Sequence, residues 1–353
     1  MEAEVDVLIR GAGPVGCALA LALQGDRLRV SVFDPSFGQP IKGFRPIALS
    51  YASRLILERV GAWEGLPVTP IETVQVTQQG GFGRTRIEAR DAGVPALGYV
   101  TEYAPLLAAL RKLLQGKSVV IASRPVTARC DVHAEGASGE GEEKRYAQDA
   151  LLTVVRLAAH AGTTAHERFT AEGPLALLPH AGRYALIWSA SPARVRRLAE
   201  MPAAGFLAEL AAAIGRLPTP IEAEPRTVRP LTLRVRPARV AERAVYIGNA
   251  AQTLHPVAGQ GLNLGLRDAW ELAQILRDAN DPGDPTTLAR YSARRRLDAG
   301  ATVRITDVLA GAFLGSGRLA SAARGAALTA LDIFPAPRRF FARRMIYGPS
   351  ALP

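Results

Sequence analysis

Gly11-Ala-Gly-Pro-Val-Gly16 is the stretch of sequence that decides the fold of this chain. A short apolar run at residues 5–9 precedes it, and an Ala- and Leu-rich run at 17–24 follows it. A second apolar run at 28–33 ends at Asp34. This order predicts a buried strand, a tight turn, a helix and a second parallel strand within about thirty residues, which is a compact βαβ unit.

The glycines at 11, 13 and 16 permit a tight turn, close approach of the backbone to a pyrophosphate, and close packing of helix on strand. Pro14 and Val15 complete a helix start whose free N–H groups and dipole favour phosphate. Asp34, at the end of the second strand, is placed to accept hydrogen bonds from ribose hydroxyls. The sequence therefore predicts a dinucleotide site, although a Gly-rich turn without a ligand is the plainer alternative.

The first motif alone does not separate NAD from FAD. A second one follows far downstream: Tyr246-Ile-Gly-Asn-Ala-Ala-Gln-Thr-Leu-His-Pro-Val-Ala-Gly-Gln-Gly-Leu-Asn-Leu-Gly-Leu-Arg-Asp268. It predicts a strand, a Gly-rich loop and a helix over 261–277. A second helix start is then available to the other end of a long cofactor.

This segment resembles the second FAD motif of the class A flavin monooxygenases, the para-hydroxybenzoate hydroxylase superfamily, and in particular its ubiquinone-biosynthesis hydroxylases. Three other stretches agree with that family: Arg45-Pro-Ile-Ala-Leu-Ser50, His166-Glu-Arg-Phe-Thr-Ala-Glu-Gly-Pro-Leu-Ala-Leu-Leu-Pro179, and Tyr291-Ser-Ala-Arg-Arg-Arg296 with Thr306-Asp307. Because they span nearly the whole chain, chance similarity is a poor explanation.

The resemblance implies FAD as cofactor and assigns further residues to its site. Gly248 and Asn249 would lie near the ribityl–phosphate part, and Arg45 near the flavin or its phosphates, unless it forms a surface salt bridge. His255 and Pro256 would lie beside the flavin ring as candidate catalytic residues, unless His255 is a structural loop residue. The loop that follows would also bind the cofactor, through Ala258, Gly259, Gln260, Gly261, Leu262 and Asn263.

Two positions depart from the family pattern. The family has Asp where this chain has Asn249, and it has Asp-Gly where this chain has Glu135-Gly136. The segment before Glu135 is also short, since a predicted strand at 118–123 reaches it with little room for further strands. Either a hairpin has been lost or residues are missing from the sequence, and the residues do not decide between these.

By resemblance, NAD(P)H reduces FAD, molecular oxygen adds to give a flavin hydroperoxide, and a hydroxyl passes to the ring of a membrane-resident polyprenyl phenol in ubiquinone biosynthesis. Two alternatives stay open: an FAD-dependent isoprenoid reductase, and a non-catalytic flavoprotein subunit of a quinone-synthesis assembly. Other ubiquinone-synthesis proteins are possible partners.

The predicted fold class is α/β, with a Rossmann-like FAD-binding domain of the glutathione-reductase-like βαβ type, an interleaved β-sheet substrate domain and a C-terminal helical segment. The FAD-binding domain is predicted at 1–75, 98–150 and 236–285, and the substrate domain at 76–97 and 151–235. Helices are expected at 48–60, 103–114, 287–309 and 321–331, a polar loop at 136–144, and a hairpin joining 175–178 to 183–188. Residues 286–353 form the basic, helical segment.

Charge and composition narrow the remaining possibilities. The net charge is +11, and from Arg290 onward 11 basic and 3 acidic residues leave a local excess of +8. Phenylalanines among these arginines favour contact with a membrane surface over nucleic acid, although a solvated helix face is the plainer alternative. The acidic N-terminus and the lack of a long apolar run predict a cytoplasmic protein, peripheral to the inner face of the membrane.

Several classes of enzyme find no support in the sequence. The five histidines are scattered and give no metal-ligand spacing, so no metal site is predicted. There is no G-x-S-x-G hydrolase elbow, and the glycine motif lacks the Lys-Ser/Thr of a P-loop. Cys17 and Cys130 do not belong to a cysteine pattern typical of disulfide-rich proteins, which fits a reducing compartment.

Overall fold

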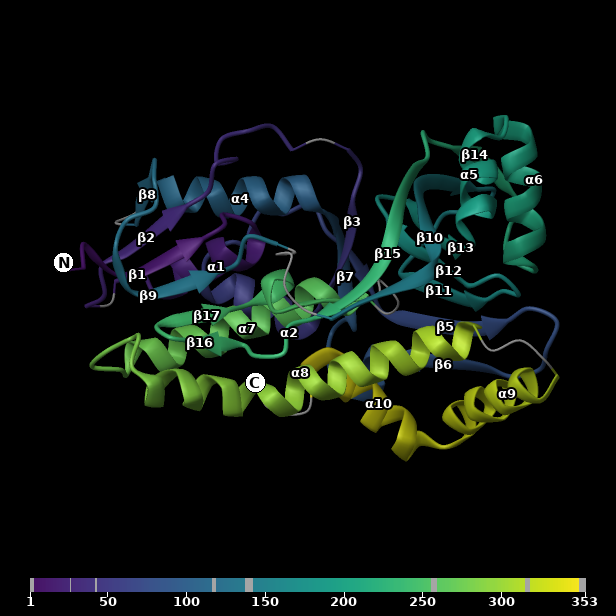
Figure 1. The fold of residues 1–353 in the computed structure, drawn as a ribbon. Helices are drawn as coiled ribbons and strands as arrows, with labels where there is room; N and C mark the ends of the chain where they lie inside the picture. The colour runs from purple at the N-terminus through teal and green to yellow at the C-terminus, as the bar shows by residue number, and fades with distance from the viewer. Residues whose placement is uncertain are drawn as a thin grey trace.

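The computed structural model describes residues 3–25, 27–41, 43–115, 119–136, 142–254, 259–314 and 318–348. In this part of the chain, a six-stranded and a nine-stranded sheet lie at opposite ends of an elongated molecule, with helices packed around the first (Figure 1). A third sheet has three strands, which in the sequence lie between strands of the two larger sheets. The predicted α/β fold class is confirmed.

The six-stranded sheet contains the βαβ unit. Its strands in spatial order are β16 (Val240–Ala241), β17 (Ala244–Tyr246), β9 (Ala128–His133), β1 (Val5–Arg10), β2 (Val30–Phe33) and β8 (Val120–Ala122). All pairs from β17 to β8 are parallel, and β1 is central with Val7, Leu8 and Ile9 fully buried. Strands covered on both faces read as continuous apolar runs, which is why β1 and β2 could be predicted.

Three helices pack around this sheet. α1 (Pro14–Ala22) follows the glycine motif and contacts both α4 (Tyr103–Gln115) and α7 (Gln260–Arg277). Gly16 permits close packing here, because a Cβ atom at this position would lie 2.0 Å from the Gly11 carbonyl oxygen. Helix α7, predicted from residue 261, begins one residue earlier, so the second strand–loop–helix motif has the expected form.

The nine-stranded sheet forms the wall opposite the βαβ unit. It runs β18 (Gln252–Thr253), β15 (Thr227–Val235), β10 (Glu142–Leu157), β13 (Arg183–Ala190), β12 (Pro174–His180), β11 (Thr164–Phe169), β5 (Thr73–Gln78) and β6 (Arg84–Glu88), with β14 (Pro220–Ala223) beside β10. The predicted hairpin is β12–β13, turned at Ala181 and Gly182, both with positive φ. Side chains of α5 (Pro192–Glu200) and α6 (Ala203–Ile214) share one apolar core with this sheet.

The predicted helix at 48–60 is wrong over its first three residues. Residues 46–50 form strand β3, which pairs with β7 (Gly98–Glu102), and β7 also pairs with β4 (Thr69–Ile71). The helix α2 (Tyr51–Arg59) begins only after Ser50, whose hydroxyl accepts a hydrogen bond from the Ser53 N–H and caps it. Apolar residues occur on both sides of this boundary, so periodicity alone did not show it.

The region before Glu135 also differs from expectation. Strand β9 lies between the predicted strand at 118–123 and Glu135, where the sequence left little room for a further strand, and it pairs with β1. Buried and partly exposed residues alternate along it, with Cys130 and Val132 facing inward. Because polar residues lie between the buried ones, the sequence shows no continuous apolar run here. Strand β10 begins at Glu142, inside the predicted polar loop at 136–144, and residues 137–141 of that loop lie outside the described ranges.

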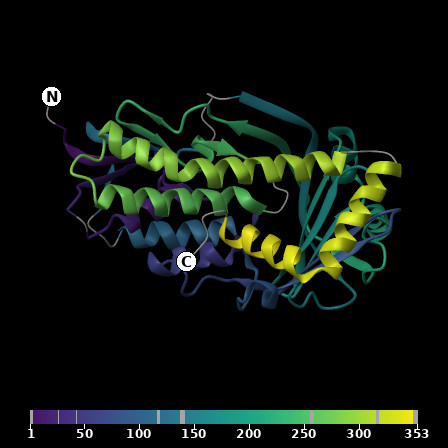
Figure 2. The ribbon, with the colours of Figure 1, turned by 90° about the horizontal axis from the view of Figure 1, so that it is seen from below.

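Three helices close the chain. α8 (Pro285–Leu314) runs back along α7, and α9 (Arg318–Ile333) packs on β5 and β6 at the edge of the nine-stranded sheet (Figure 2). α10 (Pro335–Tyr347) then turns back to contact α2 and β3. α9 ends at Ile333, and Pro335 starts α10, where the first helical position needs no N–H donor, while Pro337 lies in the first turn of the same helix. A short helix, α3 (Ala89–Ala92), packs against α10. Within the described ranges, no helix is both long and apolar enough to cross a membrane.

Candidate cofactor and substrate site

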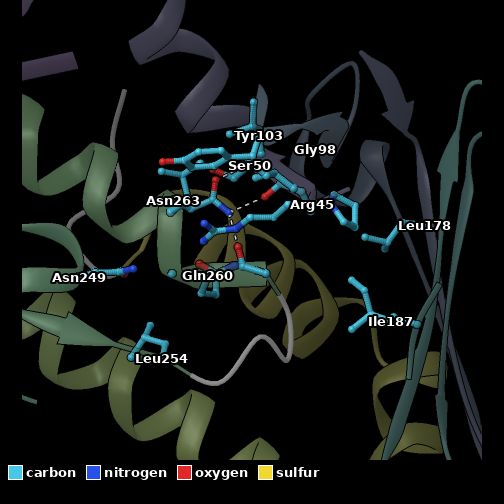
Figure 3. A pocket seen from close by; sticks show the side chains of 18 of the residues that line it. Arg45, Ser50, Gly98, Tyr103, Leu178, Ile187, Asn249, Leu254, Gln260 and Asn263 are labelled. Carbon is cyan, nitrogen blue, oxygen red and sulfur yellow. Dashed lines mark hydrogen bonds between the residues drawn. The ribbon is translucent and has the colours of Figure 1, made fainter. Parts of the chain in front are cut away.

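A cavity of about 1580 Å³ is lined by the βαβ unit on one side and by the nine-stranded sheet on the other. In Figure 3, Asn263, Gln260 and Arg45 lie on one side, and Leu178 and Ile187 project from the sheet opposite. Pockets for drug-sized ligands usually measure about 300–1,000 Å³, so this cavity has room for a dinucleotide and a second molecule.

The structure brings most of the predicted cofactor residues to this cavity. Those that line it are Gly11, Gly13, Pro14, Val15, Asp34, Arg45, Asn249, Gly259, Gln260, Gly261, Leu262 and Asn263. Gly16 and Gly248 do not line it. His255, Pro256 and Ala258 lie outside the described residues.

The glycine motif leaves a backbone-lined space at the start of α1. Gly11 has φ +101°, and a Cβ atom there would lie 2.6 Å from the Cα of Glu135. A Cβ atom at Gly13 would instead meet only the Tyr103 hydroxyl, 3.7 Å away. A side chain at residue 13 would therefore fill the space before the helix start, which glycine keeps open. Such a space suits a pyrophosphate.

Asp34 is fixed at the end of β2 as predicted. Its Oδ2 accepts a hydrogen bond from the Ala12 N–H at 2.7 Å, and its Oδ1 accepts bonds from the Ser36 N–H and hydroxyl, also at 2.7 Å. Burial acts to raise the pKa of Asp34, but the bonds from Ser36 and Ala12 and the charge of Arg111 outweigh it, so the pKa lies below its usual value. Asp34 is therefore a charged acceptor at neutral pH.

Two cavity residues from α4 were missed in the sequence. Tyr103 stacks under the Arg45 guanidinium, 4.6 Å from ring centroid to Cζ. One Arg111 guanidinium nitrogen lies 3.7 Å from Asp34, and its Nε donates to the Ala12 carbonyl oxygen at 3.1 Å. Residues 103, 107 and 111 all line the cavity and share one helix face, so this spacing was the available signal. Arg45 and Arg111 place positive charge beside the glycine motif.

The start of α7 provides the second helix N-terminus. Gly259 caps this helix in the left-handed conformation, with φ +60°. A Cβ atom added to Gly259 would lie 3.2 Å from the Cβ of Ala48. The N–H groups of the first turn have no partner within the helix, so they are available to an anion or a developing negative charge.

Asn263 joins α7 to β3 and α2. Its side-chain oxygen accepts hydrogen bonds from the Ser50 N–H at 2.8 Å and the Ser53 hydroxyl at 2.7 Å. Its amide nitrogen donates to the carbonyl oxygens of Ala48 at 2.9 Å and Gly259 at 2.7 Å. The amide is thus fully used within the protein, and it positions the Gly259 turn.

Replacing Asn263 with leucine should lower the free energy of unfolding by about 2–3 kcal/mol, because buried partners lose their hydrogen bonds. FAD affinity should fall too, since the Gly259 turn loses its anchor. Denaturant unfolding and flavin titration measure the two effects. The control is Gln115→Leu, a polar residue at the exposed end of α4. Unfolding equal to wild type would contradict the role of Asn263.

Gly248 and Asn249 sit in a short 3₁₀ helix (Gly248–Ala250). The Gly248 N–H donates to Asp268 Oδ2 at 3.1 Å, and Gly248 has φ +58° with Val15 packed against it. Gly248 therefore supports the site from behind, while Asn249 reaches the cavity. Asp268 in turn belongs to a buried ionic network with Arg295 and Asp298.

Glu135 follows β9 at the edge of the cavity. Its Oε1 lies 2.8 Å from His133 Nδ1, and the His133 ring stacks on Tyr246 at 4.6 Å between centroids. Burial acts to raise the pKa of Glu135, but the hydrogen bond with His133 outweighs it and the pKa is lowered. The carboxylate at this departure from the family pattern is thus charged and held in place.

The far wall of the cavity is largely apolar. Strands of the nine-stranded sheet contribute Val74, Val76, Ile87, Leu152, Leu178 and Ile187. Helices α9 and α10 close one side with Leu328, Leu331, Phe341 and Met345. This helical wall was not expected from the sequence. No group of three or more His, Cys, Asp or Glu side chains suited to a metal occurs in the described part of the chain.

Comparison with known proteins agrees with this architecture. The family model described as FAD binding domain matches residues 129–306. The chain is 34% identical to the ubiquinone hydroxylase UbiL of Rhodospirillum rubrum, over 96% of this chain and 88% of that protein. It is 29% identical to the 3-demethoxyubiquinol 3-hydroxylase of Escherichia coli, over 83% of this chain and 86% of that protein.

Among solved structures, the p-nitrophenol 4-monooxygenase PnpA of Pseudomonas putida superposes with a TM-score of 0.77 at 16% identity, covering 97% of each chain. At this identity the likeness shows the shared fold.

Proposed function

This chain belongs to the FAD-binding family of flavin-dependent hydroxylases, and we propose that it hydroxylates the ring of a polyprenylated phenol in ubiquinone biosynthesis. The observation that carries this proposal is the continuous cavity. On one side it has a helix N-terminus suited to binding phosphate, and on the other it has the apolar wall of the nine-stranded sheet.

The residues around the glycine motif fit FAD. Gly11, Gly13 and the start of α1 would hold the pyrophosphate, and Asp34 would accept from the adenosine ribose. Arg45 and Asn249 would reach the remaining polar parts, and the N–H groups that begin α7 would face the flavin. Bound FAD supplies the redox chemistry, with NAD(P)H as electron donor and molecular oxygen as co-substrate.

The remaining cavity fits a prenylated ring. Its walls would exclude water and orient the substrate. Relatives named for ubiquinone hydroxylation support a polyprenyl phenol as the class of substrate. The division into an FAD-binding part at 1–75, 98–150 and 236–285, a substrate part at 76–97 and 151–235, and the segment 286–353 remains a proposal.

A spectroscopic experiment tests the cofactor and its reduction. Purified protein should be yellow, and anaerobic NADPH should bleach the flavin faster when a short-chain prenyl phenol is present. A yellow protein that NADPH never bleaches with any phenol would instead indicate a non-catalytic flavoprotein. A colourless protein unable to bind added FAD would contradict the cofactor assignment.

We further propose that α10 and the end of α9 touch an anionic membrane surface. Ile333, Phe334 and Phe340 are 63%, 58% and 74% exposed, and Arg339 and Arg343 are exposed beside them. The opposite face of α10 lines the cavity through Phe341 and Met345. One helix would therefore connect the bilayer with the site, as a membrane-resident substrate requires.

The double variant Phe334→Ser with Phe340→Ser should bind vesicles containing anionic phospholipid about tenfold more weakly, because two apolar anchors are lost. Vesicle co-sedimentation measures this. Leu297→Ser removes an equally exposed apolar side chain, 71% exposed on α8, and serves as the matched control. If the double variant and the control bound vesicles equally, the docking surface would be misplaced.

A further inference from the structure

Glu167 is a carboxyl group on the apolar wall of the cavity. It lies on β11, directly opposite Val76 of β5 and Ala176 of β12. Along its own strand, the neighbours on the same face are Ala165 and Phe169, and all of these residues line the cavity with it. A polar side chain surrounded in this way usually has a partner.

No such partner is present in the described part of the chain. Across the described residues, no hydrogen bond or ion pair reaches the Glu167 carboxyl group, and its accessible part faces the cavity interior. The next cross-strand neighbour of Val76 is Thr85 on β6, which is 1% exposed and whose hydroxyl also has no partner among these residues. Two polar groups thus lie in one cross-strand row, with the apolar Val76 between them.

We propose that Glu167 is a catalytic base that contacts the hydroxyl group of the phenol substrate and takes its proton. This inference rests on the proposed function of the same site. The substrate O–H bond breaks, the proton forms a carboxyl O–H bond on Glu167, and the electron pair stays on the substrate oxygen. The phenolate ring is richer in electrons and therefore reacts faster with an electrophilic oxygen donor.

The ionisation of Glu167 suits this role. Burial raises the pKa of Glu167 to about 7, so both the acid and the base form are present near neutral pH. A base is most effective when its pKa lies near the working pH. The same burial would cost free energy that nothing in the described protein offsets, which is common where a side chain serves a ligand.

Other charged groups near β11 do not substitute for it. The adjacent strands β5 and β12 present Val74, Val76, Ala176 and Leu178 to the cavity, and His180 lies at the end of β12 beside Glu102. Arg324 of α9 and Arg229 of β15 also line the cavity, but neither can accept a proton at neutral pH. His166 and Arg168 alternate to the opposite face, where they contact Tyr184 and Thr77.

The test uses FAD-loaded full-length protein and a series of short-chain prenyl phenols of increasing acidity. Glu167→Gln keeps the shape of the side chain and removes the base, so hydroxylation should slow by about 10²- to 10⁴-fold. This defect should shrink as the phenol becomes more acidic, because an ionised substrate needs no base. The wild-type rate should rise with pH through the region near 7, and the variant should lack that rise.

A second readout needs no turnover. Under anaerobic conditions without reductant, infrared spectra at pH 6 should show a protonated-carboxyl band that Glu167→Gln lacks. Adding a prenyl phenol should shift this band, and adding the matching compound without its hydroxyl group should not. Glu222→Gln, an exposed residue of β14, is the control for both measurements.

The outcomes separate this inference from the proposed function. If the wild type forms no hydroxylated phenol, the proposed function fails. If the wild type is active and Glu167→Gln is equally active, or is slowed by the same factor for every phenol, Glu167 is not the base.

Discussion

Replacing Gly11 with alanine is expected to lower the affinity for FAD by roughly 100-fold or more. Two costs add at this position. The backbone has φ +101°, where a side chain is strained, and the new Cβ atom would lie 2.6–2.7 Å from backbone atoms of Ala134 and Glu135. These are backbone atoms that directly follow β9, so they cannot rotate away as a side chain could. The turn must move, and the start of α1 moves with it.

Gly61→Ala is the matched control for this prediction. Gly61 also has a positive φ, +79°, but no atom lies within 4 Å of its ideal Cβ position. This variant should lose only about 1 kcal/mol of stability and should remain yellow. Flavin fluorescence titration compares the two proteins. Wild-type FAD affinity in Gly11→Ala would show that the glycine motif does not form the cofactor site.

Replacing Asp268 with alanine should lower the free energy of unfolding by about 3–5 kcal/mol. The side chain is fully buried, and its Oδ1 accepts from Arg295 Nε at 2.7 Å while Oδ2 accepts from Gly248 N–H and from Gln252 Nε2 at 3.0 Å. Arg295 is also buried and pairs with Asp298. Without Asp268, the Arg295 charge loses one of its two carboxylate partners inside the protein.

Denaturant unfolding measures this loss, and Glu222→Ala breaks an exposed ion pair with Arg156 for comparison. The exposed pair should contribute less than about 1 kcal/mol. Similar stabilities for the two variants would contradict the structural role of the buried network.

The same network gives a direction for pH dependence. Burial acts to raise the pKa of Asp298, but the charges of Arg267 and Arg295 outweigh it, and the pKa lies below its usual value. The stability that this group contributes is therefore present at neutral pH. It is lost as the pH falls below the usual carboxyl pKa and through the lowered one.

The βαβ unit could be predicted from sequence because its signal is local. Glycine spacing, two buried strands and a terminal acid all lie between residues 5 and 34. The strand–loop–helix motif that begins α7 is local in the same way. Strand β3 was missed because apolar residues occur both in it and in α2, which follows at once, and β9 was missed because its buried residues alternate with polar ones.

The rest of the site depends on contacts distant in sequence. Arg111 and Tyr103 meet the glycine motif only through the packing of α4 on α1, and the neighbours of Glu167 come from β5 and β12. A spacing such as that of residues 103, 107 and 111 indicates a shared helix face, but it does not show which distant element that face meets. The roles of His255, Pro256 and Ala258 stay predictions, since these residues lie outside the described ranges.

Isotope labelling tests the central claim most directly. FAD-loaded protein is supplied with NADPH, a short-chain prenyl phenol and oxygen-18 gas, and the product is analysed by mass spectrometry. We predict a ring-hydroxylated product that carries one oxygen-18 atom and that forms only when phenol, reductant and oxygen are all present. Reductant oxidised with no labelled product, for any phenol offered, would contradict the assignment of this cavity to a monooxygenase.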